Sequence, residues 1–201
     1  MHLFRPPLAL RLLFPTAIWK GEKNAVYLTF DDGPTPLITN KVLDLLFKLQ
    51  VKATFFCIGK KAEEHSAIVS RIRSEGHQIG NHSFQHEKGT HTGNDNYFES
   101  IKRCDVIVKS NLFRPPYGRI TPVQFLHITK KLGKKVVFWS WLSYDYDNEI
   151  STETILLKSK SIKGGDILVF HDAEKSAERL LVLLEHVIRE VKDKGLHFKT
   201  L

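Results

Sequence analysis

Two clusters of polar residues have the types and spacing of a metal-binding site. Asp31 and Asp32 follow an apolar run, and two adjacent carboxylates repel each other unless a cation binds them. His82 and His86 stand four residues apart, a spacing that puts two side chains on one face of a helical turn. Asp32 with both histidines suits a divalent metal that keeps positions open for water and substrate. A polar Asp-Gly-Pro turn and a histidine pair without function are the alternatives.

Two further segments could act on a substrate beside such a metal. Arg114 precedes two prolines, which make a rigid bend and hold the Tyr117 N–H in one direction. We expect Arg114 to pair with a carboxylate and the Tyr117 amide to face the substrate. His171 directly follows another apolar run, which would place it at the mouth of a barrel. A stiff surface turn with a solvated arginine and a packed histidine are the alternatives.

An aromatic and acidic cluster lies between these segments and contains Trp139, Trp141, Tyr144, Asp145 and Tyr146. Aromatic faces stack on sugar rings, but they also fill the rim of a barrel. The residue types alone leave both interpretations open.

The elements that must position these groups alternate between apolar runs and amphipathic stretches. We expect strands over residues 25–30, 53–58, 77–80, 112–113, 135–139 and 166–170, with a last one possible in the tail 196–201. We expect helices over 37–49, 60–75, 97–109, 122–132, 152–161 and 174–194. This alternation predicts an α/β fold with a parallel sheet, and six or seven such units favour a barrel. The active site of such a barrel lies at the carboxyl ends of its strands.

Composition places the chain among ordinary globular domains. Its 201 residues are enough for one domain, and the formal charge is +8. The basic residues are scattered, and no basic stripe with interleaved aromatics is present, so we expect no nucleic-acid partner. The positive charge indicates a solvated basic surface, and the more specific alternative is attraction to an acidic cell-wall polymer. Cys57 and Cys104 are expected to be buried free thiols.

The N-terminal stretch, residues 1–24, is apolar but is interrupted by arginines and prolines. It lacks the uninterrupted core and cleavage site of a signal peptide and is too short and too charged to span a bilayer. We expect a segment packed on the domain formed by residues 25–201, with membrane-surface association as a lesser alternative. The compartment stays open between cytoplasm and cell envelope, and the oligomeric state is not indicated.

Taken together, five ordered segments resemble the polysaccharide deacetylase family, the NodB-homology domain of carbohydrate esterase family four. They are residues 29–34, 82–86, 114–117, the region around Asp145, and 168–171. The resemblance covers the chain from about residue 25 onward. It implies a distorted (β/α) barrel of about seven parallel strands.

The resemblance also implies roles for the first three segments. Asp32, His82 and His86 match the metal ligands of the family. Asp31 matches its general base, held by Arg114. The ligand types favour Zn²⁺, although Co²⁺, Ni²⁺ and Mn²⁺ suit the same set.

The later segments are similar to the family's remaining catalytic groups. His171 matches the general acid, and Asp145 is expected to orient it. Leu168 is expected to line the pocket that receives the acetyl methyl group. Tyr117 matches the residue whose backbone amide helps to hold the oxyanion.

The fourth segment departs from the family, because Tyr146 follows Asp145 where a tryptophan is usual. We expect Tyr146 on the substrate-facing wall and Trp141 as a residue that could compensate for the change. The activity implied is removal of N-acetyl groups from N-acetylglucosamine units of peptidoglycan or a chitin-like glycan. The alternatives are an O-acetyl esterase acting on xylan or another acetylated sugar, and a sugar-binding pseudoenzyme.

Overall fold

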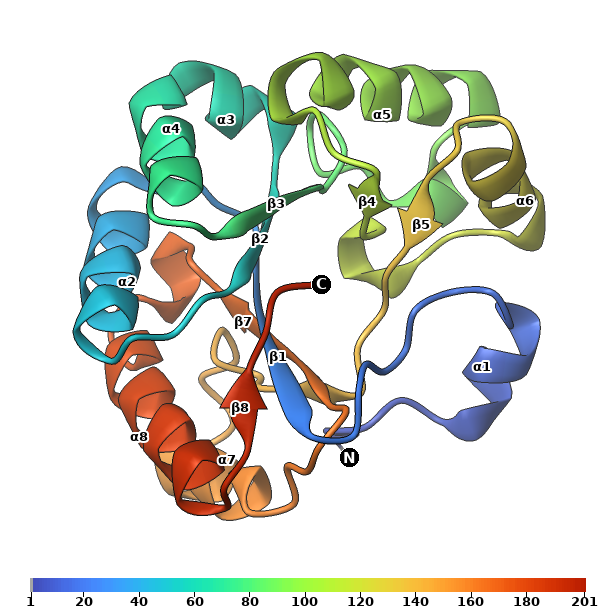
Figure 1. Cartoon of the computed structure of the whole chain (residues 1–201). Helices are drawn as coiled ribbons and strands as arrows, with labels where there is room; N and C mark the ends of the chain where they lie inside the picture. The colour runs from blue at the N-terminus through green and yellow to red at the C-terminus, as the bar shows by residue number, and fades with distance from the viewer. Residues whose placement is uncertain (1) are drawn as a thin grey trace.

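A curved sheet of parallel strands forms the centre of the computed structural model, which describes residues 2–201 (Figure 1). The strand order is β5-β4-β3-β2-β1-β7-β6, and β8 pairs with β1 beside this path. The strands are β1 (Ala25–Asp31), β2 (Thr54–Cys57), β3 (Gln78–Asn81), β4 (Leu112–Phe113), β5 (Lys135–Val136), β6 (Trp141–Leu142), β7 (Ile167–His171) and β8 (His197–Phe198). Seven strands thus curl into a half-barrel, which confirms the predicted α/β fold class.

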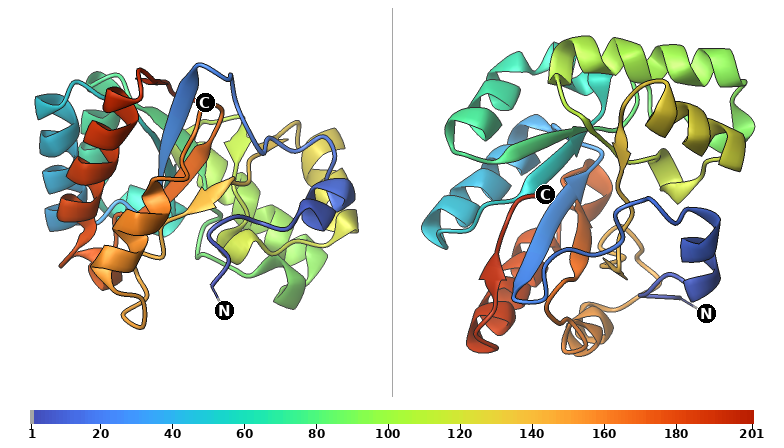
Figure 2. Two further views of the ribbon diagram at one scale, coloured as in Figure 1. Left: turned by 90° about the horizontal axis from the view of Figure 1, so that it is seen from below. Right: turned by 45° about the vertical axis from the view of Figure 1, so that its right-hand side comes forward.

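The main helices lie on the outside of the curved sheet (Figures 1 and 2). They are α1 (Leu8–Leu13), α2 (Pro36–Lys48), α3 (Gly59–Glu64), α4 (Ser66–Ser74), α5 (Asn94–Val108), α6 (Pro122–Lys130), α7 (Thr152–Ser159) and α8 (Leu180–Asp193). Three short 3₁₀ turns join them, η1 (Gly89–His91), η2 (Pro116–Gly118) and η3 (Glu174–Ser176). None of the helices in residues 2–201 is long and apolar enough to cross a membrane.

The two faces of each central strand bury different residues. In β1, Leu28 and Phe30 belong to the large apolar core that also contains buried residues of α2, α4 and α8. Tyr27 belongs to a separate cluster. Because side chains alternate along a strand, Asp31 lies on the same face as Tyr27. The register pairs Asp31 with His171, so the last residues of β1 and β7 point to the same side.

Three of the expected elements are clearly divided or shortened in the structure. The helix expected over residues 60–75 is two helices, because His65 leaves helical geometry with φ −123° and ψ 46°. The strand expected over residues 135–139 keeps only β5. The helix expected from residue 174 begins as η3 and becomes α-helical at Leu180. Periodicity detects the apolar residues of these segments but not the points where the backbone changes direction.

The sheet stays open between its end strands, and the N-terminal segment lies against both of them. Within residues 2–201 no ladder joins β5 to β6. The Ile18 N–H donates to the Val136 carbonyl at 2.8 Å, and Ile18 accepts from the Phe138 N–H at 2.9 Å. At the other end strand, the Leu142 N–H donates to the Phe4 carbonyl at 2.9 Å. The division of the chain at residue 25 itself stays a prediction.

Candidate active site

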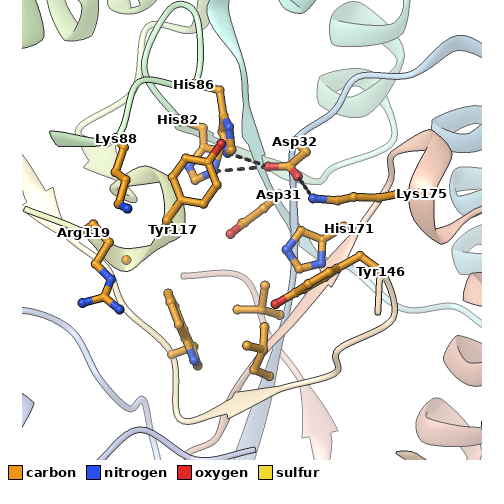
Figure 3. Close-up of a pocket in the computed structure, with 14 residues that line it drawn as sticks. Asp31, Asp32, His82, His86, Lys88, Tyr117, Arg119, Tyr146, His171 and Lys175 are labelled. Atoms are coloured by element: carbon orange, nitrogen blue, oxygen red, sulfur yellow. Dashed lines mark hydrogen bonds and ion pairs between the residues drawn. The ribbon is translucent and has the colours of Figure 1, made fainter. Parts of the chain in front are cut away.

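A cleft of about 650 Å³ opens where the carboxyl ends of β1, β3 and β7 meet. Figure 3 shows its side chains. Eight residues singled out in the sequence line it: Asp31, Asp32, His82, His86, Tyr117, Trp139, Tyr146 and His171. Two more, Arg114 and Asp145, are fully buried and each binds one of these residues.

Asp32, His82 and His86 form a group whose ligand atoms all lie within 4.8 Å of one another. The Oδ1 atom of Asp32 is 3.0 Å from Nε2 of His86 and 3.5 Å from Nε2 of His82. Burial raises the pKa of Asp32, but hydrogen bonds to both histidines outweigh it and hold that pKa well below its usual range. Two imidazole nitrogens and one carboxylate oxygen that converge in this way fit a divalent metal.

The backbone of the neighbouring strand orients the first of these imidazoles. Nδ1 of His82 lies 2.8 Å from the carbonyl oxygen of Arg114, so the ring nitrogen donates there as an N–H. This bond assigns the hydrogen to Nδ1 and leaves the lone pair of Nε2 free for a metal. The segment that follows β4 therefore supports the metal group through a carbonyl.

The two histidines come together through a loop, so the single helical turn expected for them is wrong. His82 follows β3 directly, and both Ser83 and His86 have left-handed backbones, with φ 60° and 61°. The Asn81 side-chain oxygen accepts the Ser83 N–H at 2.8 Å, and its amide donates to the Ile101 carbonyl at 2.8 Å. Spacing by four residues therefore gave the right pair for a different geometric reason.

Asp31 is held by an arginine that is itself completely buried. The Arg114 guanidinium donates to Oδ1 of Asp31 at 2.7 Å, to the Thr29 hydroxyl at 2.6 Å and to the Phe138 carbonyl at 3.1 Å. It also lies over the ring of Phe56, 4.1 Å from its centre. Burial lowers the pKa of Arg114, and the Asp31 carboxylate opposes that shift. A buried cation with this many acceptors is a rigid support.

His171 is bound to a buried carboxylate at two points. Its Nδ1 lies 2.8 Å from Oδ1 of Asp145, and its backbone N–H donates to Oδ2 at 2.7 Å. The Ser143 hydroxyl donates to the same carboxylate at 2.7 Å. Burial lowers the pKa of His171, but the charge and hydrogen bond of Asp145 outweigh it and raise the pKa above its ordinary value. The ring of Tyr146 stands edge-on to His171, with 4.8 Å between the ring centres.

Tyr117 lines the cleft from a strained turn. It lies in η2 with φ 58°, a left-handed conformation that is uncommon for a tyrosine. Its ring centre is 4.6 Å from that of His86, and the residue is 61% exposed. The rigid bend predicted from the two prolines is present, and the Gly118 N–H closes it on the Pro115 carbonyl at 2.9 Å.

The prediction that Leu168 lines the pocket is wrong. Leu168 is fully buried in the large core, whereas Val169 lines the cleft. Side chains alternate along a strand, so only residues separated by an even number from His171 can share its face. Val169 is two positions before His171 and so shares its face. Leu168 is three positions before His171 and points to the opposite face.

Trp141 is likewise a core residue. Its side chain is fully buried, and its ring lies 6.0 Å from those of Phe4 and Phe170. Its expected contact with substrate is therefore wrong, and Trp139 and Leu142 line the cleft in its place. The chain has already turned between the two tryptophans, a change that residue type could not reveal.

Three cationic residues of the cleft were not predicted from the sequence, namely Lys88, Arg119 and Lys175. Lys175 donates to Oδ2 of Asp32 at 2.7 Å, and its ammonium lies 4.8 Å from the centre of the Tyr146 ring. The signal that could have found Lys175 is its position just after the strand end that carries a catalytic-type histidine.

Comparison with known proteins now identifies the family. The sequence profile described as polysaccharide deacetylase matches residues 19–137, which is more than half of the chain. The chain belongs to the polysaccharide deacetylase family. The predicted family is thereby confirmed, and the protein is a deacetylase of carbohydrate esterase family four.

Relatives of this deacetylase extend over most of its length. The peptidoglycan-N-acetylglucosamine deacetylase of Bacillus cereus is 33% identical over 191 residues, which cover 90% of this chain and 89% of the relative. The chitooligosaccharide deacetylase of Azorhizobium caulinodans is 30% identical over 158 residues, which cover 75% of both chains. A crystal structure of a peptidoglycan N-acetylglucosamine deacetylase bound to a naphthalenyl N-hydroxybenzamide superimposes with a TM-score of 0.89 and 32% identity. It covers 98% of this deacetylase and 95% of that chain.

Proposed function

We propose that this deacetylase hydrolyses N-acetyl groups on N-acetylglucosamine units of peptidoglycan or a chitin-like glycan. One observation carries the proposal: a metal-type group, a separate carboxylate and a histidine bound to a carboxylate line a single cleft. The two relatives named above, whose names refer to peptidoglycan and to chitooligosaccharide, support an amide on a glycan as the substrate. Residues 25–201 form the catalytic domain in this proposal, with residues 1–24 packed against it.

Asp32, His82 and His86 hold the metal in this proposal. The ligand types favour Zn²⁺, and Co²⁺, Ni²⁺ or Mn²⁺ suit the same donors. When bound, the ion supplies a Lewis acid that polarises the acetyl carbonyl and makes water more acidic. The Nδ1–H bond of His82 to the Arg114 carbonyl keeps the opposite nitrogen aimed at the ligand group.

Asp31 is the general base. Arg114 holds one of its oxygens at 2.7 Å, which restricts the carboxylate to one orientation facing the cleft. Asp31 accepts the proton of the attacking water while the new carbon–oxygen bond forms. The neighbouring Asp32 cannot do this, because its Oδ1 faces the two imidazoles.

His171 is the general acid, and the Tyr117 N–H stabilises the oxyanion. An amine leaves only after protonation, so an imidazolium must give a proton to the departing nitrogen. Asp145 raises the pKa of His171 and fixes the ring through Nδ1, so Nε2 is the nitrogen that donates. One amide donor to an oxyanion is typically worth about 3 kcal/mol.

Acetate release tests the proposal directly. We expect the protein loaded with Zn²⁺ to release acetate from N-acetylglucosamine oligomers and peptidoglycan, and to stop when a chelator removes the ion. Faster release from O-acetylated xylan than from every N-acetylated glycan would make the protein an O-acetyl esterase. Binding of these glycans without any acetate release would make it a pseudoenzyme.

A further inference from the structure

Two cationic side chains on one wall of the cleft have no acidic partner. Lys88 follows the histidine loop and Arg119 follows η2, and both line the cleft. In Figure 3 they lie together on the side opposite Lys175 and His171. Across residues 2–201, neither forms an ion pair with a carboxylate, whereas Lys175 is paired with Asp32.

The acidic groups of the cleft cannot neutralise this wall, because both are already engaged. Asp31 is bound by Arg114, and Asp32 is bound by Lys175 and by the two metal-type histidines. Two like charges that face one cleft repel each other, and a bound anion relieves that repulsion. Unpaired charges of one sign on a cleft wall also attract their counter-ion from solution. The wall is therefore suited to an anionic group of the substrate.

Aromatic side chains next to the two cations indicate what carries the anion. The Trp139 ring lies against the backbone of Gly118, so close that a Cβ on Gly118 would be 2.5 Å from the ring. Tyr117, whose ring is exposed, directly precedes Gly118 in the chain, and Arg119 directly follows it. Aromatic faces next to polar donors suit a sugar ring, and the planar donors of Arg119 suit a carboxylate.

We propose that Lys88 and Arg119 form a carboxylate-binding subsite that makes this deacetylase prefer glycans with acidic sugars over neutral ones. This inference rests on the proposed function and narrows its substrate class. An N-acetylglucosamine unit enters the reacting end of the cleft, while a neighbouring sugar places its carboxylate between the two cations. The charges act on binding and leave the hydrolytic step to the residues around the metal group.

Two substrates with the same sugar chain, one with charged lactyl groups and one with neutral ones, test the subsite. One is an oligosaccharide of alternating N-acetylglucosamine and N-acetylmuramic acid, whose lactyl groups carry carboxylates. The other is the same oligosaccharide after those carboxylates are converted to methylamides. We expect the metal-loaded wild-type protein to have a KM about tenfold lower for the acidic form, with similar kcat. Added salt should raise only the KM for the acidic form.

The variant Lys88→Gln/Arg119→Gln should bring the ratio of the two KM values close to one. The matched control Lys130→Gln/Lys131→Gln removes the same charge from the surface around the end of α6 and should keep the wild-type ratio. Equal KM values for the two substrates in wild type would contradict the proposed subsite, and so would an unchanged ratio in Lys88→Gln/Arg119→Gln. In either case, acetate release would still support the proposed function. Acetate release from neither substrate would refute the proposed function, and the subsite with it.

Discussion

Asp31 and Asp32 are adjacent and chemically identical, yet the fold gives them different partners. Asp31 extends from the end of β1 toward the buried guanidinium of Arg114. Asp32 has φ 73°, a left-handed backbone that turns its carboxylate toward His82 and His86. Two carboxylates that would repel each other thus face different partners, and the proposed function assigns proton transfer to Asp31 and metal binding to Asp32.

Amide substitutions separate these two roles. Asp31→Asn should keep its metal but lose activity by about 10²–10⁴-fold, because an amide cannot accept the proton of water. Asp32→Asn should lose most of its metal, since a three-ligand site has no spare ligand. Metal analysis of the purified variants and acetate release measure the two effects. Metal loss in Asp31→Asn with retention in Asp32→Asn would mean that the roles are reversed.

The nature of the leaving group tests His171. His171→Ala should lose about 10²–10⁴-fold in kcat/KM on an N-acetylglucosamine oligomer. Its loss on an activated aryl acetate should be much smaller, because that leaving group departs without a proton. Metal content should stay at the wild-type level. Equal losses on both substrates would show that His171 positions the substrate and is not the acid.

The pH profile tests the partner of that histidine. Asp145 raises the pKa of His171, so the imidazolium persists to higher pH than an ordinary histidine would allow. The alkaline limb of kcat/KM should therefore fall above the usual histidine pKa of about 6.5. Asp145→Asn removes the negative charge and should move that limb to lower pH. A limb that does not move would assign it to another group.

At the scale of single elements, β7 shows how far the sequence could be interpreted. The apolar run and the histidine at its end predict a buried strand that carries a site residue, and both features are present. The choice between Leu168 and Val169 required only the period of two along a strand. The geometry of His82 and His86, by contrast, depends on left-handed residues in a loop, and no periodic pattern encodes those.

Substitutions in β7 should therefore have separate effects on stability and on binding. Leu168→Ala should lower the free energy of unfolding by about 2–5 kcal/mol, because it leaves a cavity in the large core. Its KM should stay close to wild type. Val169→Leu adds volume on the cleft face and should raise KM. Chemical denaturation and steady-state kinetics measure the two effects, and a raised KM in Leu168→Ala with no loss of stability would contradict the assignment of faces.

At the scale of the whole molecule, strand and helix alternation predicts the parallel sheet but not where it stays open. The alternation of apolar and amphipathic stretches predicts how many strands and helices there are. Whether the sheet closes into a barrel depends instead on the length of each strand and on the turn between β5 and β6. The N-terminal contacts were equally invisible in the sequence. Phe4 and Ile18 meet strands more than a hundred residues later in the chain, and no local pattern specifies such pairs.

Another distant contact of the N-terminal segment, between Arg5 and Asp166, should contribute to stability. Arg5 donates to both oxygens of Asp166 at 3.0 and 2.7 Å, and the Asp166 carboxylate has no exposed surface. Arg5→Met should lower the free energy of unfolding at neutral pH by about 1–3 kcal/mol, since the buried carboxylate loses two charge-assisted hydrogen bonds. The Ser140 hydroxyl and the Lys163 N–H still donate to it in the variant. Lys41→Met, at an exposed position, is the control.

The sign of the pH dependence follows from the pKa of Asp166. Burial raises that pKa, but the hydrogen bond from Arg5 and other contacts outweigh it and lower the pKa below its ordinary value. The stabilisation is then complete above the unfolded pKa of about 4 and disappears as pH falls through the folded value. The difference between wild type and Arg5→Met should shrink in acid. A difference that grows in acid would contradict this ion pair.

The hydrogen bonds from Phe4 and Ile18 also bear on solubility. The end strands of an open sheet expose unpaired N–H and carbonyl groups, and such edges recruit strands from other molecules. Here Ile18 pairs beside β5 and Phe4 beside β6, so one segment shields both edges. A shortened chain that begins at Trp19 would uncover them together. We expect this shortened chain to associate into β-rich aggregates, and to do so more at higher protein concentration. The aggregation should precede any disruption of the cleft.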